Sequence, residues 1–259
     1  NAVAIAGLDG RINYVNPALL RLWELESADA VVGRQVSEFW EDETELAATT
    51  RALRSARAWT GEMRARTATG RVLQLQVSAS VVLDEARNGI AILGSFQDVT
   101  ERHASEAALR ASLAQTPADI VAFVHAETST GVLNPAQALA AVAHEHDALV
   151  IVDAVTSFGG HPLEIGAWGI DACYSCTQKC LGAPSGLAPV VFGPKALARK
   201  VTCRSFYFDV TLLEDYWVRR KYHHTMSSTL VYALDEALAI IEDEGLDARW
   251  ARHQQNHLT

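Results

Sequence analysis

The segment YSCTQKCLGAPSG, at residues 174–186, places Lys179 between two cysteines and ahead of a Gly-Ala-Pro run that predicts a turn. A lysine amine can form a Schiff base with an aldehyde, whereas most lysines only carry a solvated charge. A carboxylate, Asp153, ends the apolar run ALVIVDA 26 residues earlier. These are the two groups that a pyridoxal-phosphate site requires, because the carboxylate keeps the pyridine nitrogen protonated while the ring accepts electrons. Residue types and spacing alone leave both alternatives open.

The elements that must position these two residues alternate between strands and helices. Strands are predicted at residues 119–126, 148–154, 170–176 and 187–193, with a helix at residues 135–147. The apolar run at 148–154 is typical of a strand buried on both faces, and hence of a mainly parallel α/β sheet. Ligands bind beyond the carboxyl ends of strands in such sheets, where Asp153 ends one strand and Lys179 follows another.

The first 110 residues carry a different pattern. Five β-prone or alternating runs predict strands, the last three of them antiparallel, at residues 2–7, 12–16, 62–68, 71–83 and 89–100. Gly10 supplies a hairpin turn between the first two, and Pro17 suits the first turn of a helix. Residues 101–114 contain no helix breaker, so a helix is predicted to leave this sheet.

The composition separates the two parts and limits the expected partners. All four lysines and all four cysteines lie beyond residue 170, and residues 1–102 contain no histidine. A net charge of −9 does not suit a nucleic-acid surface, which needs clustered basic residues. No apolar run approaches the ~18 residues of a membrane span. Small molecules or proteins are therefore the expected partners, with neither nucleic acid nor a membrane.

The first part contains the segments DGRINYVNPA, WTGEMRARTATGRVLQLQVSAS and DVTERHASEAALR. With the order of predicted elements, they resemble a PAS domain and its exit helix over about residues 1–110. The resemblance implies that Asp98 and Thr100 tie the sheet to the helix that passes signals onward, although they would equally cap that helix. Neither flavin nor haem is expected here, because a flavin-adduct sensor needs a cysteine and a haem sensor a histidine. A small ligand or a protein partner is expected instead.

The second part contains four ordered blocks, which are HAETSTGVLNP (125–135), VDAVTSFGGHPL (152–163), IDACYSCTQKCLGAPSG (170–186) and YHHT (222–225). Together they resemble the class V pyridoxal-phosphate-dependent aminotransferases of the alanine-glyoxylate and serine-pyruvate type, over about residues 116–259. The resemblance implies a fragment of the α/β large domain of a fold-type I transferase. The expected architecture is therefore two-domain, beginning with an α+β PAS-like antiparallel sheet with short helices.

The resemblance also implies roles for single residues. Lys179 would form the Schiff base with pyridoxal 5'-phosphate and then move the proton between the substrate Cα and the cofactor. Asp153 would pair with the pyridinium nitrogen, and Val155 would pack under the ring. The implied reaction transfers an amino group from alanine or serine to a keto acid such as glyoxylate or pyruvate.

Four further residues match groups that hold the cofactor in this family. Thr128 matches a hydroxyl that binds it, and Gln178 matches a residue that helps to hold its phosphate. Tyr222 and Thr225 match groups that reach the phosphate from the other subunit, which implies a homodimer. Each has a structural alternative: Thr128 as a turn former, Gln178 in a structural role, and the YHHT segment as ordinary surface or, through its paired histidines, a metal site.

The cysteines form a C-x2-C-x3-C pattern that is also found in metal sites. If residues 170–176 form a strand, however, Cys173 and Cys176 point to opposite faces, and Cys203 is distant. No metal site is therefore expected. We expect the cysteines to be free thiols in a reducing compartment, the cytoplasm.

The expected organisation is a PAS-like domain at residues 1–100, an exit helix and junction at 101–118, and a partial aminotransferase large domain at 119–259. From the resemblance, we expect these residues to lack the cofactor loop that precedes the first block in the family, and also the small domain that binds the substrate carboxylate. An aminotransferase core that is incomplete as a catalyst is thus one expectation. The alternatives are a sensory or interaction module with an inactive aminotransferase-like segment, and an artificial or truncated join of two fragments.

Overall fold

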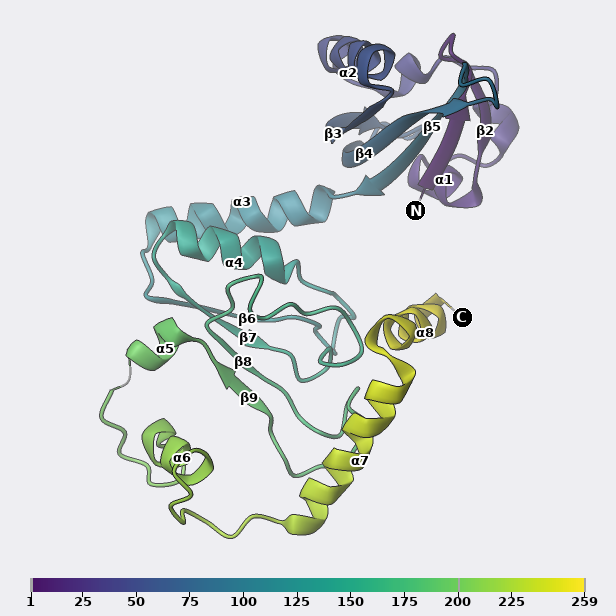
Figure 1. Ribbon diagram of the computed structural model, residues 1–259. Coiled ribbons are helices and arrows are strands. Elements are labelled where there is room, and N and C mark those ends of the chain that lie inside the picture. The colour runs from purple at the N-terminus through teal and green to yellow at the C-terminus, as the bar shows by residue number, and fades with distance from the viewer. Residues whose placement is uncertain (1, 200, 259) are drawn as a thin grey trace. The chain divides into compact units, whose positions relative to one another are not determined.

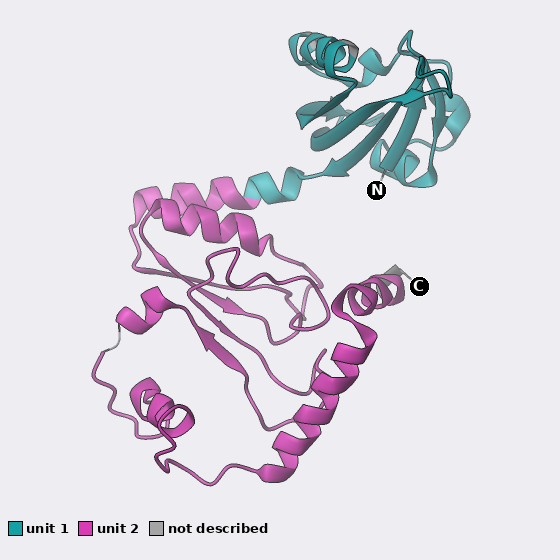
Figure 2. Cartoon of the chain, in the orientation of Figure 1, with its two compact units in different colours: residues 1–104 teal, residues 105–259 magenta. Residues whose placement is uncertain are grey.

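The computed structural model describes residues 2–199 and 201–258. The chain divides into two compact units, unit 1 at Asn1–Ala104 and unit 2 at Ser105–Thr259 (Figure 2). A single helix, α3 at Thr100–Gln115, contains the boundary between them. Among the described residues, no helix is long and apolar enough to cross a membrane.

Unit 1 is built on one antiparallel sheet of five strands in the order β2-β1-β5-β4-β3 (Figure 1). The strands are β1 Ala2–Ala6, β2 Ile12–Val15, β3 Ala58–Arg66, β4 Val72–Leu83 and β5 Gly89–Asp98. The helical segments between β2 and β3 are α1 Pro17–Leu22, the 3₁₀ turns Ala28–Ala30 and Val36–Phe39, and α2 Glu43–Ala56. The predicted strands and the antiparallel arrangement of the last three are confirmed.

Local chemistry explains how unit 1 begins. Gly10 adopts a φ of 83° in the turn between β1 and β2, a region that glycine enters without a steric cost. The Asn16 side chain accepts a hydrogen bond from the Leu19 amide and so caps α1, whose first residue is Pro17. The predicted turn at Gly10 and the predicted helix start at Pro17 are therefore both confirmed.

The core of unit 1 lies between the sheet and its helices. Leu73, Leu75 and Val77 alternate along β4 and are at most 2% exposed. Trp23 meets Phe39 and Phe96 edge to face, with ring centroids 6.0 and 5.2 Å apart. Alternation along one long strand thus supplies a face against which the aromatic side chains pack.

Asp98 and Thr100 join the last strand to α3. The Asp98 carboxylate accepts the Thr100 amide at 2.9 Å, in the manner of a helix cap, and the Thr100 hydroxyl at 2.6 Å. The same hydroxyl oxygen accepts the Gln74 amide of β4 at 2.9 Å. Glu62 of β3 adds hydrogen bonds to Arg102 and His103. The two structural roles expected of this pair therefore coexist, and α3 starts from a fixed position on the sheet.

Unit 2 contains a four-stranded sheet in the order β6-β7-β8-β9 (Figure 1). The strands are β6 Ile120–Val124, β7 Leu149–Asp153, β8 Ala172–Tyr174 and β9 Val190–Phe192. The first three are parallel and β9 is antiparallel, which confirms a mainly parallel sheet. The expected strand at 170–176 is shorter, because its partner β7 ends at Asp153, opposite Tyr174. The argument that a continuous strand separates Cys173 from Cys176 is therefore wrong.

The helices of unit 2 are α4 Ala136–Glu145, α5 Pro194–Ala198, α6 Val210–Trp217, α7 Ser228–Glu244 and α8 Leu246–Leu258. Helix α4 packs on β7, where Val150 and Val152 are fully buried while Leu149 and Ile151 are half-buried. The strand is thus fully buried on one face only, a correction to the expected burial on both. At the sheet edge, Val190, Val191 and Phe192 of β9 are all exposed.

Candidate functional site

Asp153 is the last residue of β7 and lies at the carboxyl edge of the parallel strands. One carboxylate oxygen accepts the Val155 amide and the other accepts the Tyr174 hydroxyl, each at 2.8 Å. Asp153 and Tyr174 are register partners on adjacent strands. The carboxylate raises the pKa of Tyr174, because it accepts a hydrogen bond from the neutral phenol and repels the phenolate. These two hydrogen bonds fix the orientation of the Asp153 carboxylate.

Three loops meet beside this carboxylate. The Thr128 hydroxyl, after β6, lies 2.7 Å from that of Thr156, after β7. The Cys180 thiol, after β8, donates to the Thr156 carbonyl at 3.1 Å, and the Cys176 thiol donates to the Val155 carbonyl at 3.7 Å. The structure thus brings Thr128, Asp153 and Val155 to one edge, together with the loop that carries Gln178 and Lys179.

Lys179 lies on a tight turn that is held by hydrogen bonds from neighbouring residues. Thr177 is fully buried and donates its hydroxyl to the Pro184 carbonyl at 2.6 Å. Gly182, with a φ of 75°, donates its amide to the Lys179 carbonyl at 3.0 Å. Gln178 and Lys179 themselves are exposed, and within the described chain no hydrogen bond or ion pair holds the Lys179 amine. The backbone is fixed while the amine remains available.

Tyr222 and Thr225 are both exposed, and their hydroxyls lie 2.8 Å apart. Among the described residues, no hydrogen bond joins either of them to the three loops around Asp153. Between them, His223 contacts His224 and the Phe206 carbonyl, each at 2.8 Å, and its ring stacks on Phe206. The structure therefore does not bring this pair into the same chain's loop junction.

The cysteines take part in packing and backbone hydrogen bonds. All four are free, and the described residues contain no group of three or more His, Cys, Asp or Glu side chains placed to hold a metal ion. Burial raises the pKa of Cys173 to about 11, with a smaller contribution from Asp153, and burial also raises the pKa of Cys180. Burial therefore keeps the thiols of Cys173 and Cys180 protonated near neutral pH, which slows their reaction with electrophiles.

His125 supports the same edge from inside. It is 2% exposed, its Nδ1 lies 2.9 Å from the Ser157 hydroxyl, and its backbone amide donates to the Asp153 carbonyl at 2.8 Å. Burial, with a smaller contribution from nearby His161, lowers the pKa of its imidazole from 6.5 to about 4. Residue types alone missed His125, Thr156 and Tyr174, whose roles depend on strand register and on contacts between loops.

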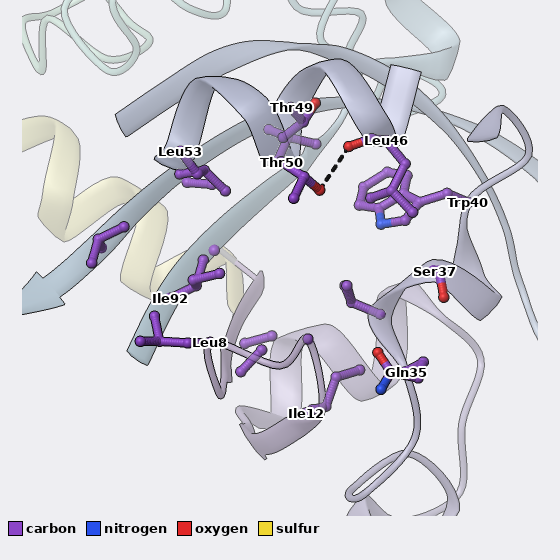
Figure 3. Close-up of a pocket in the computed structure, with 18 of the residues that line it drawn as sticks. Leu8, Ile12, Gln35, Ser37, Trp40, Leu46, Thr49, Thr50, Leu53 and Ile92 are labelled. Carbon is purple, nitrogen blue, oxygen red and sulfur yellow. Dashed lines mark hydrogen bonds between the residues drawn. The ribbon is translucent and has the colours of Figure 1, made fainter. Parts of the chain in front are cut away.

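Unit 1 contains a second candidate site, a cavity of about 560 Å³ between α2 and the sheet. Figure 3 shows Thr50 and Leu53 of α2 across the open space from Leu8 and Ile12. The wall is mostly aliphatic and aromatic. The two threonines of α2 that line the cavity, Thr49 and Thr50, donate their hydroxyls to carbonyls of their own helix at 3.0 and 2.9 Å. The volume of the cavity is in the range of small-molecule binding sites.

Two family models match the chain. The model for aminotransferase class-V matches residues 75–258, more than half of the chain, and the model for the PAS domain matches residues 1–101. The matches overlap at residues 75–101. In the structure this stretch includes β5 and most of β4, which pair within the sheet of unit 1, so its fold is that of the PAS match.

Curated relatives and solved structures match the second part. The (S)-ureidoglycine–glyoxylate transaminase of Bacillus subtilis is 40% identical over 160 residues, covering 53% of this chain and 38% of the relative. Alanine–glyoxylate aminotransferase of Oryctolagus cuniculus is 40% identical over 151 residues, covering 55% and 38%. The crystal structure of alanine–glyoxylate aminotransferase from Nostoc sp. is 43% identical with a TM-score of 0.55, over 57% of this chain and 41% of that one. The chain thus spans about two-fifths of the length of these relatives.

The buried His125 predicts a pH dependence of unit 2. The unfolded chain takes up a proton near pH 6.5 but the folded imidazole only near pH 4, so the unfolded state binds more protons between these values. Stability should therefore fall as the pH drops from 7 to 5, by about 2 kcal/mol from this group. Urea unfolding followed by hydrogen exchange of unit 2 peptides measures it.

The matched control is the exposed His146. His125→Gln should lower stability at pH 7 but flatten its dependence on pH, whereas His146→Gln should leave that dependence unchanged. An equally steep pH dependence in His125→Gln would show that this imidazole is not held neutral.

Proposed function

The chain belongs to the class-V aminotransferase family and begins with a PAS domain, and from this premise we propose that unit 2 carries the lysine half of a pyridoxal-phosphate site. Lys179 is the residue that binds the cofactor. The observation that supports this assignment is the junction of three hydrogen-bonded loops beside Asp153. It puts a fixed carboxylate and the turn that carries a free amine at one sheet edge.

The residues present fit the chemistry of this cofactor. Asp153 is already an acceptor of hydrogen bonds on both oxygens, and a protonated pyridine nitrogen is a donor of the kind that Tyr174 now supplies. Thr128 and Gln178 offer an exposed hydroxyl and an exposed amide to the cofactor and its phosphate. Val155 follows Asp153 and provides an apolar contact for the ring. The aldehyde and electron-accepting ring are what pyridoxal phosphate supplies when bound.

Each side chain then has a definite task. With the cofactor present, the Lys179 amine would hold it at its aldehyde carbon and, when free, would move the proton at the substrate Cα. Asp153 would hold the proton on the pyridine nitrogen. Arg249 is 8% exposed and donates to backbone carbonyls, so it is not available to a substrate carboxylate.

We assign glyoxylate as the amino acceptor, because both curated relatives named above are glyoxylate transaminases, with pyruvate as a second acceptor. Alanine or serine is the proposed amino donor. A cytoplasmic location stays a prediction. Because the chain covers about two-fifths of its relatives, we expect no measurable transamination from these residues alone.

The test of the lysine is covalent trapping. Incubation with pyridoxal phosphate followed by borohydride should label Lys179 weakly but in preference to the other lysines, since its turn lies beside Asp153. Peptide mass spectrometry locates the label. Lys179→Ala should remove it, and Asp153→Asn should reduce it.

The control is Lys195, an exposed lysine on α5 outside the loop junction. Lys195→Ala should leave the labelling of Lys179 unchanged. Labels distributed over all lysines according to exposure would mean that Lys179 is an ordinary surface residue, and that the aminotransferase part is inactive in this chain.

We further propose that the site is shared in a homodimer. Tyr222 is 77% exposed and bonded to Thr225 rather than to the loop junction, which suits a role in the site of a second subunit. In the segment that precedes Tyr222, Phe208 and Trp217 are 74% and 63% exposed, large apolar side chains that an interface would cover.

A shared site predicts that the labelling of Lys179 rises with protein concentration as the dimer forms. Tyr222→Phe should lower labelling at high concentration, where the partner's hydroxyl is needed, and have no effect at low concentration. Tyr232→Phe, at a tyrosine that is 74% exposed, is the control. Labelling independent of concentration, with sedimentation as a monomer throughout, would exclude the shared site.

The cavity supports a second function, in which unit 1 binds a small neutral apolar molecule. Its two charged wall residues, Asp9 and Arg57, are exposed and stand at the rim, and the α2 hydroxyls are already engaged. Gln35 and Ser37 add few further polar groups to the wall, so a ligand with many polar groups would lose more hydration than it gains in partners. Flavin and haem are not proposed for this cavity.

The probe for this function is neutral N-phenyl-1-naphthylamine, whose fluorescence rises in apolar surroundings. Ala79 of β4 lines the cavity, so Ala79→Leu should weaken binding about tenfold by occupying the space. Ser80→Leu, at an exposed position that does not line the cavity, should have no such effect. Equal binding by both variants would place the probe elsewhere.

A further inference from the structure

Arg249, on α8, reaches the loops of the candidate site although it stands 70 residues after Lys179 in the sequence. It is 8% exposed. Its Nε donates to the Gly159 carbonyl at 3.1 Å, one terminal nitrogen donates to the Cys180 carbonyl, and the other donates to Glu244 at 2.8 Å. One guanidinium therefore holds three groups from three parts of unit 2.

Two of these groups belong to the loops that carry the site. Gly159 lies in the loop that follows Asp153, and Cys180 is the residue directly after Lys179. The loops touch here, since a Cβ added at Gly160 would lie 2.5 Å from the Cys180 sulfur. Arg249 thus bridges the two loops where they are already in contact, one residue from the proposed cofactor lysine.

The charge of Arg249 is matched inside the fold. Glu244 pairs with Arg249 at 2.8 Å and accepts two hydrogen bonds from Arg252, at 2.6 and 2.9 Å. Hydrogen bonds from Arg252 and Arg249 lower the pKa of Glu244 to about 2. A buried guanidinium with a carboxylate and two carbonyls uses donors that point in three directions. A lysine ammonium has no planar fork and cannot reproduce this geometry.

We propose that Arg249 is a positioning residue for Lys179, a role that rests on the function proposed above. By fixing the Cys180 carbonyl against the loop after Asp153, it sets the direction in which the Lys179 side chain leaves the backbone. Helix α8 is therefore part of the site. A purely structural arginine would anchor α8 without affecting the order of the lysine turn.

The experiment compares Arg249→Gln and Arg249→Lys with the control Arg252→Gln. Arg252 shares Glu244 but is exposed, and no hydrogen bond in the described structure joins it to the loops. The first readout is the rate at which N-ethylmaleimide modifies Cys180, measured by mass spectrometry without cofactor. Cys203, which lies outside both loops, is the internal reference in the same sample.

Loss of a hydrogen bond from a charged group should open the turn and speed modification of Cys180 about ten- to a hundredfold in Arg249→Gln. Arg249→Lys should show a smaller increase, and Arg252→Gln none. Hydrogen exchange of peptides from α7 and α8 verifies that the helices stay folded. If Arg249→Gln unfolds α8, the comparison rests on Arg249→Lys. In that variant the modification rate of Cys180 should still rise, while the modification rate of Cys203 should stay the same.

The second readout is selective borohydride labelling of Lys179, which should fall in both Arg249 variants and persist in Arg252→Gln. Unchanged Cys180 reactivity in a folded Arg249 variant would overturn the positioning role, even where the parent chain labels well. Absence of labelling in the parent would instead refute the proposed function, and the cofactor-free thiol rates would still decide whether Arg249 orders the turn.

Discussion

The parallel pairing of β6, β7 and β8 is the constraint on which the candidate site depends. Parallel strands end at one edge of a sheet, so the three loops that follow them start side by side. Asp153 and Tyr174 are register partners at that edge, and their hydrogen bond follows directly from the pairing. Thr156 then joins the outer loops through its hydroxyl and its carbonyl. Sheet geometry, rather than closeness in sequence, assembles the site.

Local patterns predicted the elements well, because alternation and apolar runs report directly on which faces are buried. The strand that ends at Asp153 and the turn at Lys179 are examples. Strand register leaves no such local signal, so Tyr174 could not be recognised as the partner of Asp153. Arg249 was missed for a related reason, since its contacts join residues 69 and 90 positions away. The structure gives the positions of Lys179 and Asp153, whereas their roles toward a cofactor come from the family resemblance and are proposals.

The overlap of the two family matches at residues 75–101 is settled physically by strand pairing. Val77 of β4 is the register partner of Phe96 of β5, and both are buried in the core of unit 1. A segment that completes one antiparallel sheet cannot also supply strands to the parallel sheet of unit 2. The chain therefore passes between its two families within α3, whose first turn is tied to β4 through Thr100.

Because Lys179 is exposed, the proposed site would need a further group to cover it. Electrostatic interactions with a cofactor are screened wherever water reaches them, and Thr128 and Gln178 are exposed as well. Thr177 and Arg249 fix the backbone of the loops that carry the site. The Lys179 side chain itself is exposed to solvent. A second subunit that brings Tyr222 and Thr225 would supply part of that cover. The chain's own residues thus specify where the lysine stands, whereas binding of the proposed cofactor would depend also on groups from outside this loop junction.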